Sequence, residues 1–242
     1  MLIDVAATPR PSAPTQPITI VADTLRAATT ITTMHERGIK EILIAEGISD
    51  ARQLKRAHPQ ALLCGEEGGL PPPGFDYGNS PVELVAVDLD GRTAILATSN
   101  GTPLLRQHAA ADVLLIGCLR NAAATAKAAA GPDKPLLIAC AGSSSSGEPM
   151  LEDTYTAGVI VNHLIRIHEG FQLTEGAQEA FESFLAHEGD AERAFSQSAH
   201  AERLRTLGFA ADLEFCAETD VSSVVVMAEI RDGMLRTALL RS

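Results

Sequence analysis

The sequence predicts an α/β fold in which helices cover both faces of a mixed, largely parallel sheet, giving three α/β/α layers. Short apolar runs alternate with segments of helical period along the chain. The apolar residues are mainly Ala, Leu, Ile and Val, with 4% aromatic residues and no Trp. A chain of 242 residues can bury one large core. We therefore expect one α/β domain at 18–242, preceded by a flexible, Pro-rich arm at 1–17.

The order β-α-β-α-β occurs twice along the chain. The first set is expected as strands at 18–22, 41–45 and 61–64, with helices at 25–38 and 49–57. The second set is expected as strands at 93–98, 112–117 and 136–141, with helices at 102–108 and 121–130. Asp23 and Asn100 follow the first strands and are 77 residues apart, and Gly65 and Gly142 follow the third strands at the same spacing. We hypothesise that 18–66 and 93–143 are pseudo-duplicated halves.

The last third of the chain is expected to add helices and one closing strand. A helix is predicted at 152–168, and the mostly polar segment 181–208 has helical period and is predicted to lie on the surface. The β-branched run at 221–230 predicts a strand. Asp90-Gly91, between two apolar runs, is interpreted as a hairpin turn.

Charge and composition exclude several classes of partner. The net charge is −12, from 31 acidic and 19 basic residues, which disfavours binding to nucleic acid and to anionic membranes. No run approaches the roughly 20 apolar residues of a membrane span. The four cysteines form no C-x-x-C pair, and the N-terminus lacks the order of a signal peptide. We therefore expect a cytoplasmic protein with reduced thiols.

Ligands of open α/β sheets bind at the carboxyl ends of the strands. The segments 23–26, 65–69, 99–102 and 141–143 follow expected strands and concentrate carboxylates, hydroxyls and glycines. Asp23 and Glu66 can bind a hard cation. Thr24, Thr102 and the backbone N–H groups of their helix starts can hold phosphate oxygens. The alternative, that Asp23 and Asn100 are helix N-caps and the glycines only turns, stays open.

Other chemical motifs receive less support. Asp88-Leu89-Asp90 resembles an Asp-x-Asp phosphatase nucleophile, but the hairpin interpretation is favoured. Ser143-Ser144-Ser145-Ser146 lies in no G-x-S-x-G elbow and is interpreted as a flexible lid or linker. The sequence holds no G-x-x-x-x-G-K-[ST] and no G-x-G-x-x-G, so NTP and dinucleotide binding lack support.

A family resemblance extends over the strand-end loops. The stretches that carry it are ADTLRAATTI at 22–31, GEEGGL at 65–70, GFDYGNSP at 74–81, TSNGT at 98–102, CAG at 140–142, LEDT at 151–154 and DLEFCA at 212–217. In this order they resemble the 2-phosphosulfolactate phosphatases, over about residues 18–220. The combination of GFDYGNSP with the NGT and EDT motifs makes the resemblance specific.

The resemblance implies a Mg²⁺-dependent phosphatase that hydrolyses a small acidic phosphoester, 2-phosphosulfolactate, to sulfolactate and phosphate, a step toward coenzyme M. It implies catalytic roles for Asp23, Asp76 and Glu152, metal ligation by Asp23, Glu66 and Asp153, and substrate binding by Arg26, Asn79, Ser80, Asn100, Gly101, Thr102 and Gly142. It leaves open whether the chain forms a homodimer.

Two departures from the family pattern concern arginines. Glu67 stands where the family often has Arg, and the loop at 143–148 lacks an Arg that is common there. Fewer guanidinium groups should weaken recognition of a sulfonate. The alternatives are therefore a phosphatase for another 2-phospho-acid, or a catalytically silent homologue that binds an anion.

Overall fold

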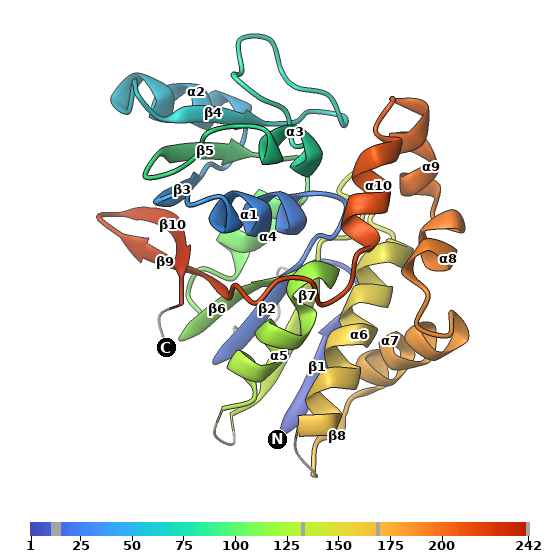
Figure 1. The fold of residues 1–242 in the computed structure, drawn as a ribbon. Helices are drawn as coiled ribbons and strands as arrows, with labels where there is room; N and C mark the ends of the chain where they lie inside the picture. The colour runs from blue at the N-terminus through green and yellow to red at the C-terminus, as the bar shows by residue number, and fades with distance from the viewer. Residues whose placement is uncertain (11–15, 132–133, 168–169, 241–242) are drawn as a thin grey trace.

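The computed structural model describes residues 1–10, 16–131, 134–167 and 170–240. They form a ten-stranded mixed sheet flanked by helices, with the order β4-β5-β3-β10-β9-β6-β2-β7-β1-β8 (Figure 1). The strands are β1 (Leu2–Ala6), β2 (Ile18–Ala22), β3 (Glu41–Ile44), β4 (Leu62–Gly65), β5 (Thr93–Ala97), β6 (Val113–Gly117), β7 (Leu136–Cys140), β8 (Gln172–Leu173), β9 (Val226–Arg231) and β10 (Met234–Leu239). The predicted three-layer α/β/α class with a largely parallel sheet is confirmed.

Helices follow most strands, as the alternating pattern predicts. They are α1 (Ala27–Glu36), α2 (Ile48–Ala57), α3 (Pro81–Val85), α4 (Gly101–Gln107), α5 (Ala122–Ala129), α6 (Leu151–Ile167), α7 (Glu175–Ala186), α8 (Ala191–Ser196), α9 (Ala199–Thr206) and α10 (Ala210–Ala217), with a 3₁₀ turn at Leu119–Asn121. Residue 168, the end of the helix predicted at 152–168 and observed as α6, lies outside the described residues.

The segments 18–66 and 93–143 are interlocked in the sheet. β2, the first strand of the earlier segment, pairs with β6 and β7 of the later one. β5, the first strand of the later segment, pairs with β3 and β4 of the earlier one. Each segment thus inserts its first strand between the second and third strands of the other. The group β4-β5-β3 corresponds strand for strand to β7-β2-β6, so the sheet holds the second group in the reverse order. The origin of the two groups by duplication stays a prediction.

A hairpin of β9 and β10 joins these two parallel groups. β10 pairs antiparallel with β3 and β9, and β9 pairs antiparallel with β6. Three successive antiparallel ladders mean that β3 and β6 run in opposite senses. The two groups are steeply inclined to each other in Figure 1, and the loops after β2, β4, β5 and β7 line one pocket.

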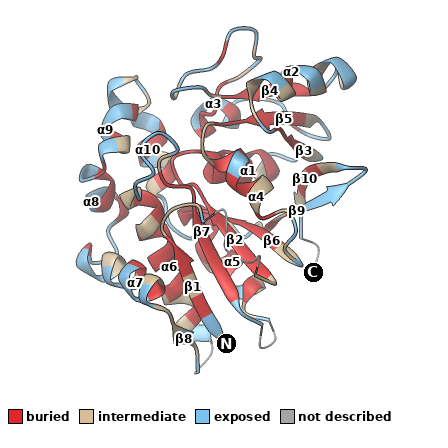
Figure 2. Cartoon of the chain, turned by 180° about the vertical axis from the view of Figure 1, so that it is seen from behind, coloured by how far each residue is buried: buried red, intermediate tan, exposed pale blue. Residues whose placement is uncertain are grey.

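Apolar side chains form three clusters, one on each outer side of the sheet groups and one between the groups. The central cluster contains Ile31 and Met34 of α1 together with Leu104 and Leu105 of α4, the first helices of the two segments. α2 packs on the outer side of β4-β5-β3 through Ala51, and α5 and α6 pack on that of β6-β2-β7. Figure 2 shows the strands largely buried and exposed residues on outer helices such as α2 and α7.

The predicted flexible arm at 1–17 is wrong for residues 2–6. These residues form β1, which pairs parallel with β7 and buries Ile3 and Val5 in the core. Residues 2–6 are a short apolar run, but the Pro-rich sequence that follows makes the whole stretch resemble a flexible arm. Residues 11–15 of the arm lie outside the described residues.

The predicted hairpin at Asp90-Gly91 is also wrong. Residues 86–90 form no strand, and the run before them is the short helix α3. Ser80 starts this helix, because its side chain accepts the backbone N–H of Glu83 and a proline occupies the first turn. The helix start therefore overrides the local β-propensity of the Val-rich run.

The hairpin of this fold forms at a second Asp-Gly pair. Asp232 and Gly233 both have positive φ, +53° and +73°, and join β9 to β10. The predicted closing strand at 221–230 corresponds to β9, whose partner β10 follows this turn.

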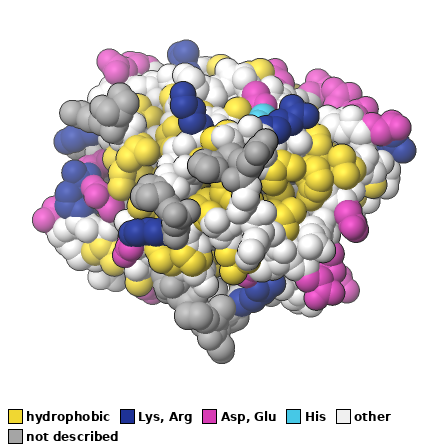
Figure 3. Space-filling model, turned by 90° about the horizontal axis from the view of Figure 1, so that it is seen from below, with side chains coloured by type: hydrophobic (Ala, Val, Ile, Leu, Met, Phe, Trp, Pro, Cys, Tyr) yellow, Lys and Arg dark blue, Asp and Glu magenta, His cyan; other side chains and the backbone are white. Residues whose placement is uncertain are grey.

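Hydrophobic side chains are exposed on the face seen from below. Figure 3 shows them across the middle of this face, with Asp and Glu mainly at its edge and Lys and Arg in scattered groups. Among the helices of the described residues, none is both long and apolar enough to cross a bilayer.

Candidate active site

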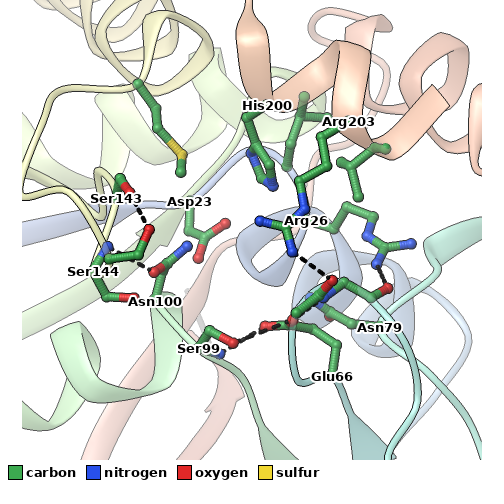
Figure 4. Close-up of a pocket in the computed structure, with 16 residues that line it drawn as sticks. Asp23, Arg26, Glu66, Asn79, Ser99, Asn100, Ser143, Ser144, His200 and Arg203 are labelled. Carbon is green, nitrogen blue, oxygen red and sulfur yellow. Dashed lines mark hydrogen bonds between the residues drawn. The ribbon is translucent and has the colours of Figure 1, made fainter. Parts of the chain in front are cut away.

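Four strand-end loops and one helix enclose a pocket of about 300 Å³ (Figure 4). The loops follow β2, β4, β5 and β7, and α9 contributes the remaining wall. The polar residues that line it are Asp23, Arg26, Glu66, Asn79, Ser99, Asn100, Ser143, Ser144, Ser145, His200 and Arg203. Several strand-end residues chosen from the sequence thus line one pocket, as the sheet architecture favours.

Asp23 follows β2 and carries a buried carboxylate into the pocket. The residue is 5% exposed, and its Oδ1 accepts the backbone N–H of Ala27 at 3.2 Å. Burial raises the pKa of Asp23 to about 6, and the nearby His200 opposes this rise. Gly101 leaves room for the carboxylate, because a Cβ there would lie 2.5 Å from Oδ2. Ionisation of Asp23 is therefore costly unless a cation lies beside it.

Glu66 follows β4 and joins two of the pocket loops. Its Oε1 accepts the backbone N–H of Ser99 at 2.6 Å, and its Oε2 accepts that of Gly69 at 2.7 Å. Gly65 precedes it with φ of +148°, where a Cβ would lie 2.0 Å from the carbonyl oxygen of Ala97. The close approach of β4 to β5 thus needs a glycine and sets the Glu66 carboxylate against the β5 loop.

Arg26 lies in the pocket wall with its charge already paired. The residue is 3% exposed, and it donates to Asp212 Oδ2 at 2.8 Å and to the Gly69 carbonyl oxygen at 2.7 Å. Its guanidinium also lies 4.0 Å from the centre of the Phe209 ring. Ser80 donates to the other oxygen of Asp212 at 2.6 Å, behind the pocket. Arg26 therefore offers an anion a partly neutralised guanidinium.

Asp153 joins two loops beneath the pocket and does not line it. Its oxygens accept the backbone N–H groups of Thr24 at 2.9 Å and Gly142 at 3.2 Å. Burial, with the nearby Asp23 carboxylate, raises the pKa of Asp153 well above its usual range. The two N–H groups lie after β2 and β7, so this carboxyl fixes the relative position of those loops.

Glu152 is buried at the start of α6, where it supports a pocket residue. It is 1% exposed, and its Oε1 lies 2.7 Å from His200 Nδ1. Its Oε2 accepts the Ser198 hydroxyl at 2.6 Å. Ser198 also caps α9, the helix that carries His200. The predicted catalytic Glu152 therefore meets the pocket through the imidazole of His200.

Asp76, a predicted catalytic residue, lies outside the pocket. It accepts the backbone N–H of Leu63 at 2.8 Å and pairs with Lys55 at 3.2 Å. These contacts lower the pKa of Asp76 against the opposing effect of its burial. The side chain is 42% exposed. Its loop pairs with the outer edge of β4, which the motif alone does not reveal.

The remaining predicted substrate-binding residues divide into two groups. Asn79 and Asn100 line the pocket. Thr102 is fully buried and exchanges hydrogen bonds with Thr98 at the start of α4. The structure thus separates residues that face the pocket from those that shape its loops.

Sequence reasoning missed His200 and Arg203. Both lie on α9, within the segment 181–208 predicted as polar surface helix. The Arg203 guanidinium donates to the Gly68 carbonyl oxygen at 3.1 Å, next to the pocket. Their i,i+3 spacing places them on one helix face, but the local pattern does not reveal which part of the fold that face meets.

Two pocket carboxylates fit Mg²⁺. Within the described ranges, no group of three or more His, Cys, Asp or Glu side chains is arranged to hold a metal ion. Asp23 and Glu66 line the pocket, whereas Asp153 lies beneath it, between the backbone N–H groups of Thr24 and Gly142. Mg²⁺ in phosphate-handling sites is commonly held by one or two carboxylates, waters and substrate oxygens. The donor set present suits such a site.

Comparison with known proteins identifies the family. The family model described as 2-phosphosulpholactate phosphatase matches residues 5–230. A probable 2-phosphosulfolactate phosphatase of Carboxydothermus hydrogenoformans is 37% identical over 216 residues, which cover 89% of this chain and 88% of that protein. One of Deinococcus radiodurans is 36% identical over 212 residues, 86% of each chain. The chain therefore belongs to the 2-phosphosulfolactate phosphatase family, whose members are phosphoric monoester hydrolases.

Proposed function

We propose that this protein hydrolyses 2-phosphosulfolactate to sulfolactate and phosphate with the help of Mg²⁺. The observation that carries the proposal is the pocket in which Asp23 and Glu66 face two guanidinium-bearing residues, Arg26 and Arg203. A volume of about 300 Å³ suits a small molecule. The names of the relatives supply the identity of the ester.

The charges around the pocket favour a metal ion. Asp23 and Glu66 would repel a phosphoester dianion, and Arg26 is already paired with Asp212. Mg²⁺ held by Asp23 and Glu66 would remove this repulsion and would neutralise charge on the phosphoryl oxygens. The raised pKa of Asp23 agrees with a carboxylate that receives a cation in its working state.

The chain's own residues would orient the ester. Asn100 Oδ1 accepts the backbone N–H of Ser144 at 3.1 Å, which leaves its amide N–H₂ as a donor toward the pocket. Arg203 lies at the pocket wall on an exposed helix face, where it can bind the acid end of the substrate. The phosphoryl group would then lie near Asp23 and Asn100.

A second candidate substrate is another 2-phospho-acid, which lacks the sulfonate. Two observations favour it: Arg26 is neutralised by Asp212, and the lining residues Ser143, Ser144 and Ser145 carry no charge. Recognition of a second strong anion then depends largely on Arg203. The chemistry would be the same for both substrates.

Phosphate release from a panel of 2-phospho-acids, with Mg²⁺ or with excess chelator, tests the proposal. The panel contains phosphosulfolactate, phospholactate and phosphoglycerate. We expect Mg²⁺-dependent release, fastest from phosphosulfolactate. Faster release from another acid would replace the substrate and keep the chemistry. No release from any acid would contradict the proposal and favour a silent anion-binding homologue, which a thermal-shift screen with phosphate and sulfonates would reveal.

A further inference from the structure

A buried carboxylate holds the pocket histidine from behind. Glu152 is 1% exposed, and both its oxygens have partners: His200 Nδ1 at 2.7 Å and the Ser198 hydroxyl at 2.6 Å. Glu152 belongs to the first turn of α6, whereas His200 belongs to α9. A contact between two separate helices thus fixes the ring.

The contact also fixes which nitrogen faces the pocket. An ionised carboxylate only accepts hydrogen bonds, so the Nδ1 of His200 carries the proton that Glu152 accepts. Nε2 is then the ring nitrogen left for the pocket, and the side chain is 19% exposed there. In Figure 4 the His200 ring lies next to Asp23 and Arg203 and points into the pocket.

Hydrolysis of the proposed substrate needs a proton at its ester oxygen. The leaving group is the hydroxyl oxygen of a 2-hydroxy acid, and an alkoxide is a poor leaving group. A positioned general acid commonly accelerates such a step about 10²- to 10⁴-fold. The pocket must therefore present a group that can donate a proton close to the phosphorus.

His200 is the pocket residue best suited to this task. Both oxygens of Glu66 accept backbone N–H groups. An arginine side chain cannot be deprotonated in proteins, so an arginine does not serve as a general acid. Asp23 and Glu66 are the proposed Mg²⁺ ligands. Among the residues that line the pocket, His200 thus combines a free ring nitrogen with a fixed orientation.

We propose that His200 donates a proton from Nε2 to the ester oxygen, and that Glu152 is the residue that positions it. This inference rests on the proposed phosphatase function. The bond between phosphorus and the ester oxygen breaks, its electron pair stays on that oxygen, and the Nε2 proton completes the hydroxyl of the 2-hydroxy acid. Water forms the new bond to phosphorus, and a proton that it loses returns to His200 through solvent.

The dependence of rate on the leaving group tests this role. The measurement is kcat/KM of the full-length protein with Mg²⁺ over a series from alkyl phosphates to p-nitrophenyl phosphate. We expect His200→Asn to lower kcat/KM about 10²-fold or more for alkyl esters and less than about tenfold for p-nitrophenyl phosphate. An acidic phenol leaves without a proton. Glu152→Gln should show the same selectivity with a smaller loss, because the ring loses its orientation.

Controls separate this role from a structural one. His58→Asn changes a histidine outside the pocket and should leave all rates unchanged. Equal losses on alkyl and aryl esters in His200→Asn, or no loss on either, would overturn the inference. If the protein hydrolyses the series but not phosphosulfolactate, only the proposed substrate is overturned. The difference between the losses of kcat/KM on alkyl and aryl esters then still decides the role of His200. No hydrolysis by the unaltered protein would overturn both.

Discussion

The two interlocked segments bring equivalent loops to the pocket with different chemistry. Asp23 and Glu66 line the pocket directly after the first and third strands of the earlier segment, whereas Asn100 and Ser143 line it three residues after the corresponding strands of the later segment. The earlier segment thus supplies carboxylates, and the later one supplies an amide and a hydroxyl. The strand arrangement of the two segments is thus nearly symmetric, whereas the pocket carboxylates of the two segments come from the earlier one.

The neutral segment supports the charged one. Ser99 donates its backbone N–H to Glu66, and Gly101 leaves space for the Asp23 carboxylate. Gly142 donates to Asp153, which in turn holds the backbone of Thr24 beside Asp23. We infer that the later segment contributes mainly by holding acidic groups in place, so changes in the two segments should differ in size.

The largest expected effect is at Asp23. Asp23→Asn keeps the shape of the side chain and removes its charge, so kcat/KM should fall about 10³-fold through loss of the proposed Mg²⁺ and of transition-state stabilisation. The matched control is Asp76→Asn, because the structure places Asp76 outside the pocket, and it should stay within about threefold. Mg²⁺-dependent phosphate release measures both. Comparable losses in the two variants would contradict the placement of the site.

A second comparison is between the two pocket arginines. Arg26→Met leaves the carboxylate of Asp212 buried and unpaired, so the free energy of unfolding should fall by about 3 to 5 kcal/mol. Arg203 is exposed, and Arg203→Met should change it by less than about 1 kcal/mol. Urea unfolding followed by circular dichroism measures the difference.

The double variant Arg26→Met/Asp212→Leu sharpens that comparison. Removing both charges should recover much of the lost stability, because the uncompensated carboxylate is the main cost. No recovery would mean that packing of Arg26 against Phe209 dominates instead.

The sequence predicts the acidic half of the site better than its helical wall. Asp23, Glu66 and Asn100 follow apolar runs closely, so the strand pattern places each of them at the carboxyl end of its strand. His200 lies on a polar helix whose position depends on long-range packing, and no local pattern encodes it. Asp76 belongs to a specific motif, but a motif does not tell which side of a strand its loop covers.

Two buried histidines near the ends of α1 and α4 lead us to expect that the folded protein loses stability in acid. Burial lowers the pKa of His35, near the end of α1, from 6.5 to about 4, and burial also lowers the pKa of His108 at the end of α4. Below pH 6.5 the unfolded chain binds a proton that the folded His35 does not bind until about pH 4. The free energy of unfolding should therefore fall by on the order of 3 kcal/mol across this window.

Urea unfolding at several pH values tests this contribution against His35→Gln. The glutamine can still hydrogen-bond to Thr237, the present partner of His35 Nε2 at 2.8 Å. The variant should lose less stability than the unaltered protein between pH 6.5 and 4. Other titrating groups, including Asp23, are common to both proteins and cancel in the difference. Parallel curves would show that His35 is protonated in the folded state.

The smallest expected effect is at Asn100, on the neutral side of the pocket. Asn100→Ala removes one hydrogen bond to the backbone N–H of Ser144, which is exposed, and a single bond of this kind contributes about 1 kcal/mol. KM should rise about tenfold, with kcat little changed, because the amide donor that would orient the ester is lost and the loop at 143–147 would be less ordered. Ser144→Ala keeps that backbone N–H and should leave KM unchanged. A loss at Asn100 as large as that at Asp23 would mean that the neutral segment contributes to the reaction itself and does more than hold acidic groups in place.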